Sequence, residues 1–166
     1  ERIVKDDEYS ELKTAEYLYA DGKKIIDKYT TSTVCLFKIT NLVQINETVS
    51  RKTGDRVINT VCNTIKQDLS SEYLFVRYMG PKFAIVFSGV EMQAVEEFMK
   101  TVKTKVESLK IQSASDYHGE EPIEVSPKIN IALATYYKGT ALEESMKKLE
   151  SYLDNADQNE NDINYL

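Results

Sequence analysis

The sequence predicts an α/β fold in which helices cover one mixed β-sheet. The run TVCLFKI at residues 33–39 is continuously apolar, as expected of a central strand that is covered on both faces. Residues 73–87 contain two further stretches of β-branched and aromatic residues, joined by a glycine–proline turn. Residues 55–69 and 94–109 instead place their apolar side chains on one face at helical spacing. Such a mixture of strands and amphipathic helices is typical of a sheet with helices packed on it.

The other elements follow from the same two periodicities. No internal repeat or linker divides the chain, so residues 1–166 are expected to form a single domain, with an N-terminal helical segment at 1–30. In chain order we expect one or two helices within 7–29, then a strand at 33–39. A short helix follows, which is capped by Thr40 or Asn41 and broken at Gly54. The remaining expected elements are a helix at 55–69, a hairpin at 73–87, a helix at 94–109, a polar connector at 112–122, a strand at 128–137, a helix at 142–153 and an edge strand at 163–166.

Composition excludes several classes of function. The net charge of −6 argues against nonspecific electrostatic binding to nucleic acid or anionic lipid. No apolar run approaches the roughly 18 residues that span a bilayer, so we expect a cytoplasmic location without direct membrane contact. Cys35 and Cys62 lack metal-type spacing and are expected to be buried free thiols. His118 is the single histidine, and the start at Glu1 suggests a fragment of a larger multidomain protein.

Two sequence motifs carry a family resemblance. The run KITNLVQINETVSRKTGDRVI, followed after a helix by RYMGPKFAIVF, resembles the GGDEF domain of diguanylate cyclases. That family reads D-x-D-x-F-K-x-I-N-D, then G-D, then R-[YF]-G-G-[DE]-E-F. Ile45-Asn46 and Gly54-Asp55 stand at the family spacing, as do the segments 7–15 and 129–134. The resemblance implies a nucleotidyl cyclase-like α+β fold, with a five-stranded, mainly antiparallel sheet flanked by helices.

The metal-binding positions of the family are replaced in this sequence. The resemblance implies two metal ions held by carboxylates, because Mg²⁺ prefers oxygen ligands and activates the attacking hydroxyl. Lys38 stands at the first carboxylate position and Thr40 at the second. Since ammonium groups repel cations, we expect no bound metal, no cofactor and no catalytic residue. The degenerate signature itself reads Met79, Gly80, Pro81, Lys82 and Phe83, so Pro81 replaces the acidic metal ligand of the family and Lys82 the glutamate that follows it.

The phosphate and product sites that the resemblance implies are also lost. Val43 stands where the family has a phosphate-binding lysine, and Asp157 and Asn161 align with the late basic residues. The tetrad at 70–73 lacks the arginine and aspartate of the inhibitory product site. Cyclase activity and binding of cyclic di-GMP by the usual allosteric route are therefore not expected.

Two residues match the guanine-reading positions of the family. Asn46 and Asp55 offer an amide and a carboxylate, which can bond the donors and the acceptor on the edge of guanine. One interpretation is a residual guanine-nucleotide pocket. The other is that both residues cap helices, because each precedes a helical stretch.

The leading hypothesis is a catalytically inactive GGDEF-like domain that serves as a protein interaction or regulatory module in bacterial cyclic di-GMP signalling. Its expected partner is another signalling protein or domain, bound through the former active-site face that carries Lys38, Lys82, Met79 and Pro81. An alternative is a metal-independent guanine-nucleotide sensor that binds GTP or GDP weakly and controls a neighbouring catalytic domain. A slow phosphohydrolase is a third option and needs a metal site.

Overall fold

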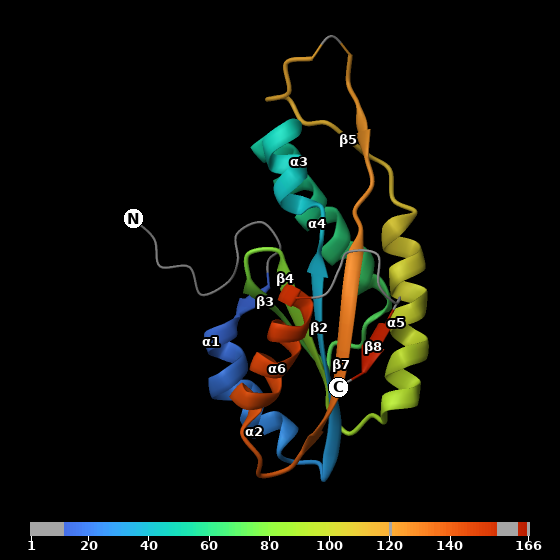
Figure 1. Ribbon diagram of the computed structural model, residues 1–166. Helices are drawn as coiled ribbons and strands as arrows, with labels where there is room; N and C mark the ends of the chain where they lie inside the picture. Colours follow the sequence, from blue (N-terminus) through green and yellow to red (C-terminus); the bar gives the residue numbers. More distant parts are fainter. Residues whose placement is uncertain (1–11, 120, 156–162, 166) are drawn as a thin grey trace.

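The protein is built on one sheet that runs through its centre. The computed structural model describes residues 12–119, 121–155 and 163–165 (Figure 1). The inner strands β3, β4, β2 and β7 are antiparallel, and an edge strand is added in parallel at each side. The predicted fold class is confirmed, and the two-residue β1 joins the five expected strands. The sheet order is β1 (Lys13–Thr14), β3 (Leu74–Met79), β4 (Lys82–Phe87), β2 (Thr31–Ile39), β7 (Ile129–Tyr137) and β8 (Ile163–Tyr165).

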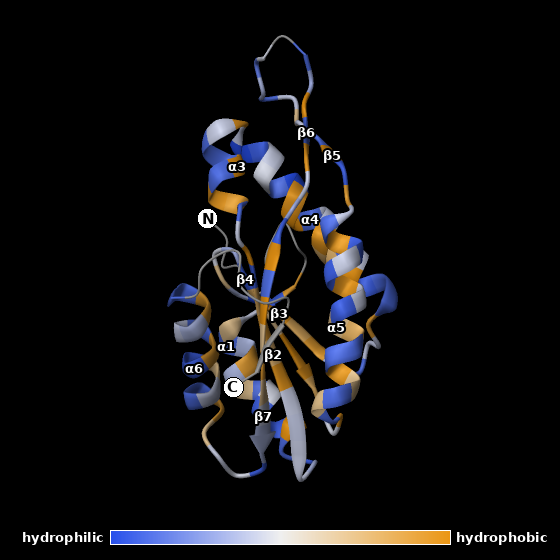
Figure 2. Cartoon of the chain, turned by 45° about the vertical axis from the view of Figure 1, so that its right-hand side comes forward, coloured by the Kyte–Doolittle hydropathy of each residue, from blue (hydrophilic) through white to orange (hydrophobic). Residues whose placement is uncertain are grey.

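Helices cover both faces of the sheet, as the continuous apolar run in β2 requires. Cys35, Phe37 and Ile39 point to one face, where they pack against the apolar sides of α4 and α5. Val34 and Leu36 point to the other face, toward α6 and the N-terminal helices. Figure 2 shows α6 on one side of the sheet and α4 and α5 on the other. The helical elements are α1 (Ala15–Tyr17), η1 (Leu18–Gly22), α2 (Lys23–Ile26), α3 (Leu42–Thr48), α4 (Arg51–Asp68), α5 (Met92–Glu107) and α6 (Leu142–Asn155).

The break between α3 and α4 lies earlier than the sequence predicts. Gly54 is buried in the first turn of α4 and does not end a helix. Ser50 caps α4 instead, because its extended backbone lets its hydroxyl accept a hydrogen bond from the Thr53 N–H. Asn41 precedes α3 as expected, but its side chain bonds the backbone of Ser126 and Lys128 and does not cap the helix.

The segment predicted as a polar connector carries a short hairpin arm. Strands β5 (Ile111–Gln112) and β6 (Glu124–Val125) pair, and the arm extends beyond the sheet in Figure 1. Its base is tied to α4, because the Ala114 N–H donates to Thr53 Oγ1 at 2.8 Å. Two-residue strands are too short to show a periodicity, so the sequence pattern did not reveal them.

Candidate functional site

The two lysines at the predicted metal-binding positions meet at one end of the sheet. Lys38 lies near the end of β2, and its cross-strand partner in β4 is Lys82. On its other side Lys38 faces Asn130 of β7. Antiparallel partners project their side chains to the same face. The sheet register therefore brings Lys38 and Lys82 together on the face that α6 covers.

Lys82 is enclosed and paired with acidic side chains. The residue is only 8% exposed. Its Nζ lies 3.0 Å from Glu150 Oε2 and 2.8 Å from Asp154 Oδ1, both on α6. Burial by itself lowers the pKa of this ammonium, but the hydrogen bonds to Asp154 and Glu150 outweigh burial and leave the pKa raised. The expectation that Lys82 forms part of an open positive face is wrong, because α6 supplies two carboxylates to it.

Lys38 lies beside this ion cluster as the cross-strand partner of Lys82. It is half-buried, and no hydrogen bond or ion pair of its ammonium is recorded in the part of the chain that the structure describes. The cluster of Lys82, Glu150 and Asp154 itself carries one positive and two negative charges. Within the described ranges, no group of three histidine, cysteine or acidic side chains could hold a metal ion.

The turn of the β3–β4 hairpin presents one apolar side chain on a well-defined tip. Gly80 adopts a φ of 58°, which a glycine reaches without strain. Arg77 Nε donates to the Gly80 carbonyl at 3.0 Å, and the Ile39 N–H donates to the Pro81 carbonyl at 2.9 Å. Met79 is 62% exposed beside them. The tip therefore holds a thioether in solvent and offers no group that could relay a proton.

The two guanine-reading candidates lie next to each other across the α3–α4 elbow. Asn46 is inside α3 and Asp55 is inside α4, so neither caps a helix, and that interpretation is wrong. The side chain of Asn46 rests on Gly54, where an added Cβ would overlap with Asn46 Oδ1. Gly54 therefore lets the Asn46 amide approach the backbone beside Asp55.

The carboxylates that neutralise Lys82 were not identified from the sequence. Glu150 and Asp154 are one helical turn apart on α6, a spacing that places both on one side of the helix. That spacing is the only local signal, and it does not say which surface they face. Asp157 and Asn161, aligned with the phosphate-binding positions of the family, lie outside the described residues, as do most of segment 7–15 and the last residue of 163–166.

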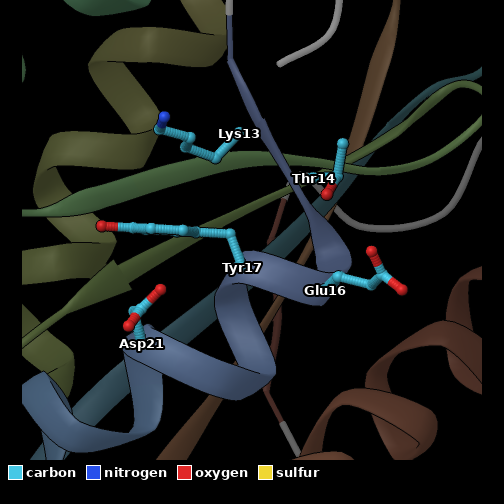
Figure 3. Close-up of a pocket in the computed structure, with 5 residues that line it drawn as sticks. All are labelled: Lys13, Thr14, Glu16, Tyr17 and Asp21. Atoms are coloured by element: carbon cyan, nitrogen blue, oxygen red, sulfur yellow. The ribbon is translucent and has the colours of Figure 1, made fainter. Parts of the chain in front are cut away.

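A cavity of about 410 Å³ lies away from this cluster, beside β1 and the N-terminal helices (Figure 3). Its lining is Lys13, Thr14, Glu16, Tyr17 and Asp21. The Lys13 ammonium lies 5.4 Å from the centre of the Tyr17 ring. In Figure 3, the side chains of Lys13 and Tyr17 extend to one side and that of Glu16 to the other. These groups do not converge on a common point, so the cavity offers no catalytic constellation.

Comparison with known proteins gives a consistent family. The family model "Diguanylate cyclase, GGDEF domain" matches residues 13–162. No curated protein matches significantly. None of the described helices has the length and apolar character needed to cross a membrane.

Three solved structures illustrate the similarity of fold. The GGDEF domain of DgcB from Caulobacter crescentus, in complex with c-di-GMP, superposes with a TM-score of 0.84 at 17% identity, covering 99% of this chain and 94% of that one. The FimX GGDEF domain from Pseudomonas aeruginosa gives 0.82 at 12% identity, covering 99% and 100%. Diguanylate cyclase SiaD from Pseudomonas aeruginosa, in complex with its activator SiaC, gives 0.82 at 14% identity. That superposition includes 98% of the present chain, which spans only 62% of the length of the SiaD chain.

Proposed function

Because the chain belongs to the GGDEF domain family, we propose that it is a catalytically inactive member that acts as a protein interaction and regulatory module in bacterial cyclic di-GMP signalling. The observation that carries this proposal is the ion cluster in which Lys82 contacts Glu150 and Asp154. A site for metal-dependent transfer of a nucleotide needs carboxylates that face a cation. In this protein the ammonium group of Lys82 pairs with the carboxylates of Glu150 and Asp154 in the place of a metal cation.

The same cluster disfavours the phosphates of a nucleotide. A triphosphate is strongly anionic and needs a metal ion or basic side chains to neutralise it. Glu150 and Asp154 would face such a group with their own negative charge once Lys82 was drawn away. The Lys82 ammonium therefore stabilises the closed cluster and leaves no net positive charge for the substrate.

Turnover of GTP tests the inactive state directly. The purified domain is expected to form no cyclic di-GMP above a protein-free blank, with either Mg²⁺ or Mn²⁺, because Lys38 and Pro81 occupy carboxylate positions. Product is measured by liquid chromatography and mass spectrometry over hours at high protein concentration. The Lys82→Ala variant separates a contaminant from the protein itself. Product that is present with the wild type and disappears with this variant would overturn the proposal.

The proposed interaction role is supported by side chains at the former active-site face, which has no catalytic task in this proposal. Met79 stands exposed on a hydrogen-bonded tip, and Lys38 lies at the same end of the sheet on β2, with Lys82 of β4 between them. SiaD, which shares the fold, is seen in complex with a protein activator. We propose that the former active-site face contacts another signalling protein or domain through Met79 and Lys38. A cytoplasmic location and a place within a larger multidomain protein remain part of this proposal.

A second candidate function rests on the α3–α4 elbow. Asn46 and Asp55 flank Gly54, and the amide of Asn46 lies against that glycine. This arrangement supports a metal-independent sensor for GTP or GDP, in which the guanine base is held while the phosphates remain in solvent. Since two side chains supply the recognition, a dissociation constant on the order of 0.1–1 mM is expected.

Calorimetry with GDP and GTP distinguishes this sensor from a purely structural elbow. Binding is expected to be the same with and without Mg²⁺, and to be lost in Asn46→Ala and Asp55→Ala. Gly54→Ala separates binding from stability more clearly than the other two variants. Its added methyl group displaces the Asn46 amide. At the same time, alanine is favoured over glycine in a helix by up to about 1 kcal/mol. Loss of binding without loss of stability in Gly54→Ala would support the sensor. Binding that needs Mg²⁺ or ignores all three variants would exclude it.

A further inference from the structure

Two exposed tyrosines gather at the end of the sheet opposite the hairpin tip. Tyr29 precedes β2 and Tyr137 ends β7, and these ends lie together at the bottom of Figure 1. Thr31 is the cross-strand partner of Tyr137, and the Lys138 N–H donates to the Thr30 carbonyl at 3.0 Å. The backbone pairing therefore places both tyrosines at the same end of the sheet. Their exposures are 45% for Tyr29 and 58% for Tyr137.

Tyr29 is positioned by a glycine on the neighbouring strand connection. Gly89 has a φ of 74°, and a Cβ added there would lie 2.6 Å from Cδ1 of the Tyr29 ring. One side of the ring thus contacts the Gly89 backbone, and the rest of the ring remains in solvent. A ring held in this way loses little conformational entropy when a partner covers it.

Three exposed lysines flank the tyrosines in the chain. Lys28 directly precedes Tyr29, Lys24 lies one turn earlier, and Lys138 directly follows Tyr137; all three are exposed. Among the described residues no ion pair or side-chain hydrogen bond is recorded for these three ammonium groups.

The acidic residue closest to them in the chain does not compensate these charges. Asp27 is engaged by Lys23 at 2.8 Å and by the Tyr136 hydroxyl at 2.8 Å. The pKa of Asp27 is lowered, first by the hydrogen bond from Lys23. Lys23 and Asp27 thus neutralise each other, and Asp27 is not the partner of Lys24, Lys28 or Lys138.

We propose that this basic aromatic end, formed by Lys24, Lys28, Tyr29, Tyr137 and Lys138, docks a short acidic segment of a partner protein. Carboxylates of such a segment would meet the lysines, and its apolar side chains would cover the two rings. The surface lies at the other end of the sheet from Met79 and Lys38. It would therefore be a second contact, independent of the former active-site face.

The surrounding charge favours a short segment over an extended polyanion. The whole protein carries a net charge of −6, and exposed Glu91, Glu143 and Glu144 follow the same strand ends in the chain. A nucleic-acid duplex or an anionic bilayer would extend past the lysines over acidic surface, where repulsion acts within a Debye length of about 8 Å. A segment of a few residues places its charges on the lysines alone.

Fluorescence anisotropy with a defined peptide tests the inference. The probe is a fluorescein-labelled peptide of about twelve residues that alternates pairs of glutamate with leucine, and its reference has glutamine in place of glutamate. The acidic probe is expected to bind the wild-type domain more tightly than the reference. The variant Lys24→Gln/Lys28→Gln/Lys138→Gln is expected to weaken it by about tenfold or more. Tyr29→Ala is expected to weaken both probes, because it removes the apolar anchor.

A matched variant separates this surface from net charge. Lys52→Gln/Lys110→Gln/Lys147→Gln removes the same charge from other exposed sites and is expected to leave probe binding within twofold of the wild type, with unchanged circular dichroism for both variants. Equal weakening by both triple variants, or no preference for the acidic probe, would overturn the proposal. Tighter binding to phosphatidylserine vesicles or to a short DNA duplex than to the acidic probe would also overturn it.

Discussion

Replacement of Lys82 by glutamate is expected to lower the free energy of unfolding by roughly 2–4 kcal/mol. The ammonium of Lys82 is 2.8 Å from Asp154 and 3.0 Å from Glu150 in a residue that is only 8% exposed. Glutamate at this position would place a third carboxylate beside these two and remove their counter-charge. Lys82→Met is expected to cost less, because it leaves two acidic groups and introduces no third.

Urea denaturation at neutral pH measures this effect. Lys147→Glu is the control, because Lys147 is exposed on α6, the helix that carries Glu150 and Asp154. This variant is expected to change the free energy of unfolding by less than about 0.5 kcal/mol. Glu150→Lys added to Lys82→Glu reverses the pair and is expected to recover part of the loss. A midpoint for Lys82→Glu that equals the wild type would show that the cluster does not stabilise the fold.

The pH dependence of this contribution follows from the raised pKa of Lys82. Its folded pKa lies above the ordinary 10.5, so the stabilisation is complete at neutral pH. It is lost only as the pH rises through the raised value. The stability difference between the wild type and Lys82→Met is therefore expected to be constant from pH 7 to about 9 and to shrink in stronger base.

The double variant Lys38→Gln/Met79→Ser is expected to reduce binding of the proposed signalling partner by about tenfold or more without lowering the melting temperature. Met79 is 62% exposed, and Lys38 has no recorded ion pair within the described ranges, so neither substitution removes a packed group. Both side chains lie at the end of β2 and the hairpin tip, where a partner would cover them together.

Quantitative pull-down from the native cell, followed by mass spectrometry, measures the bound partner. Ile123→Ser/Lys110→Gln replaces one exposed apolar residue by serine and one exposed lysine by glutamine at other positions, and serves as the control. Partner recovery that is unchanged in Lys38→Gln/Met79→Ser would place the contact elsewhere on the molecule. An equal fall in both double variants would indicate a response to charge and hydrophobicity in general.

The sequence by itself determined the elements that carry long, local patterns. The continuous apolar run at 33–39 predicted a strand covered on both faces, and Val34 and Phe37 indeed pack into opposite layers. The amphipathic stretches predicted α4, α5 and α6, because apolar residues at helical spacing define one buried side. The family resemblance assigned Asn46 and Asp55 to one site and Lys38 and Lys82 to another, and in the structure Asn46 lies against Gly54 and Lys38 is the cross-strand partner of Lys82.

Only the tertiary structure decided what surrounds these site residues. Glu150 is 68 positions from Lys82 in the chain, and no local periodicity links a strand residue to a carboxylate on a distant helix. Packing of α6 on the sheet brings them together and pairs the buried Lys82 ammonium with two carboxylates. The start of α4 was also beyond a pattern argument, because the choice between Ser50 and Gly54 depends on a cap hydrogen bond that requires one particular backbone geometry. Periodicity reports which side of an element is buried, whereas charge pairing and caps depend on atoms that the fold brings within 3 Å or so of each other.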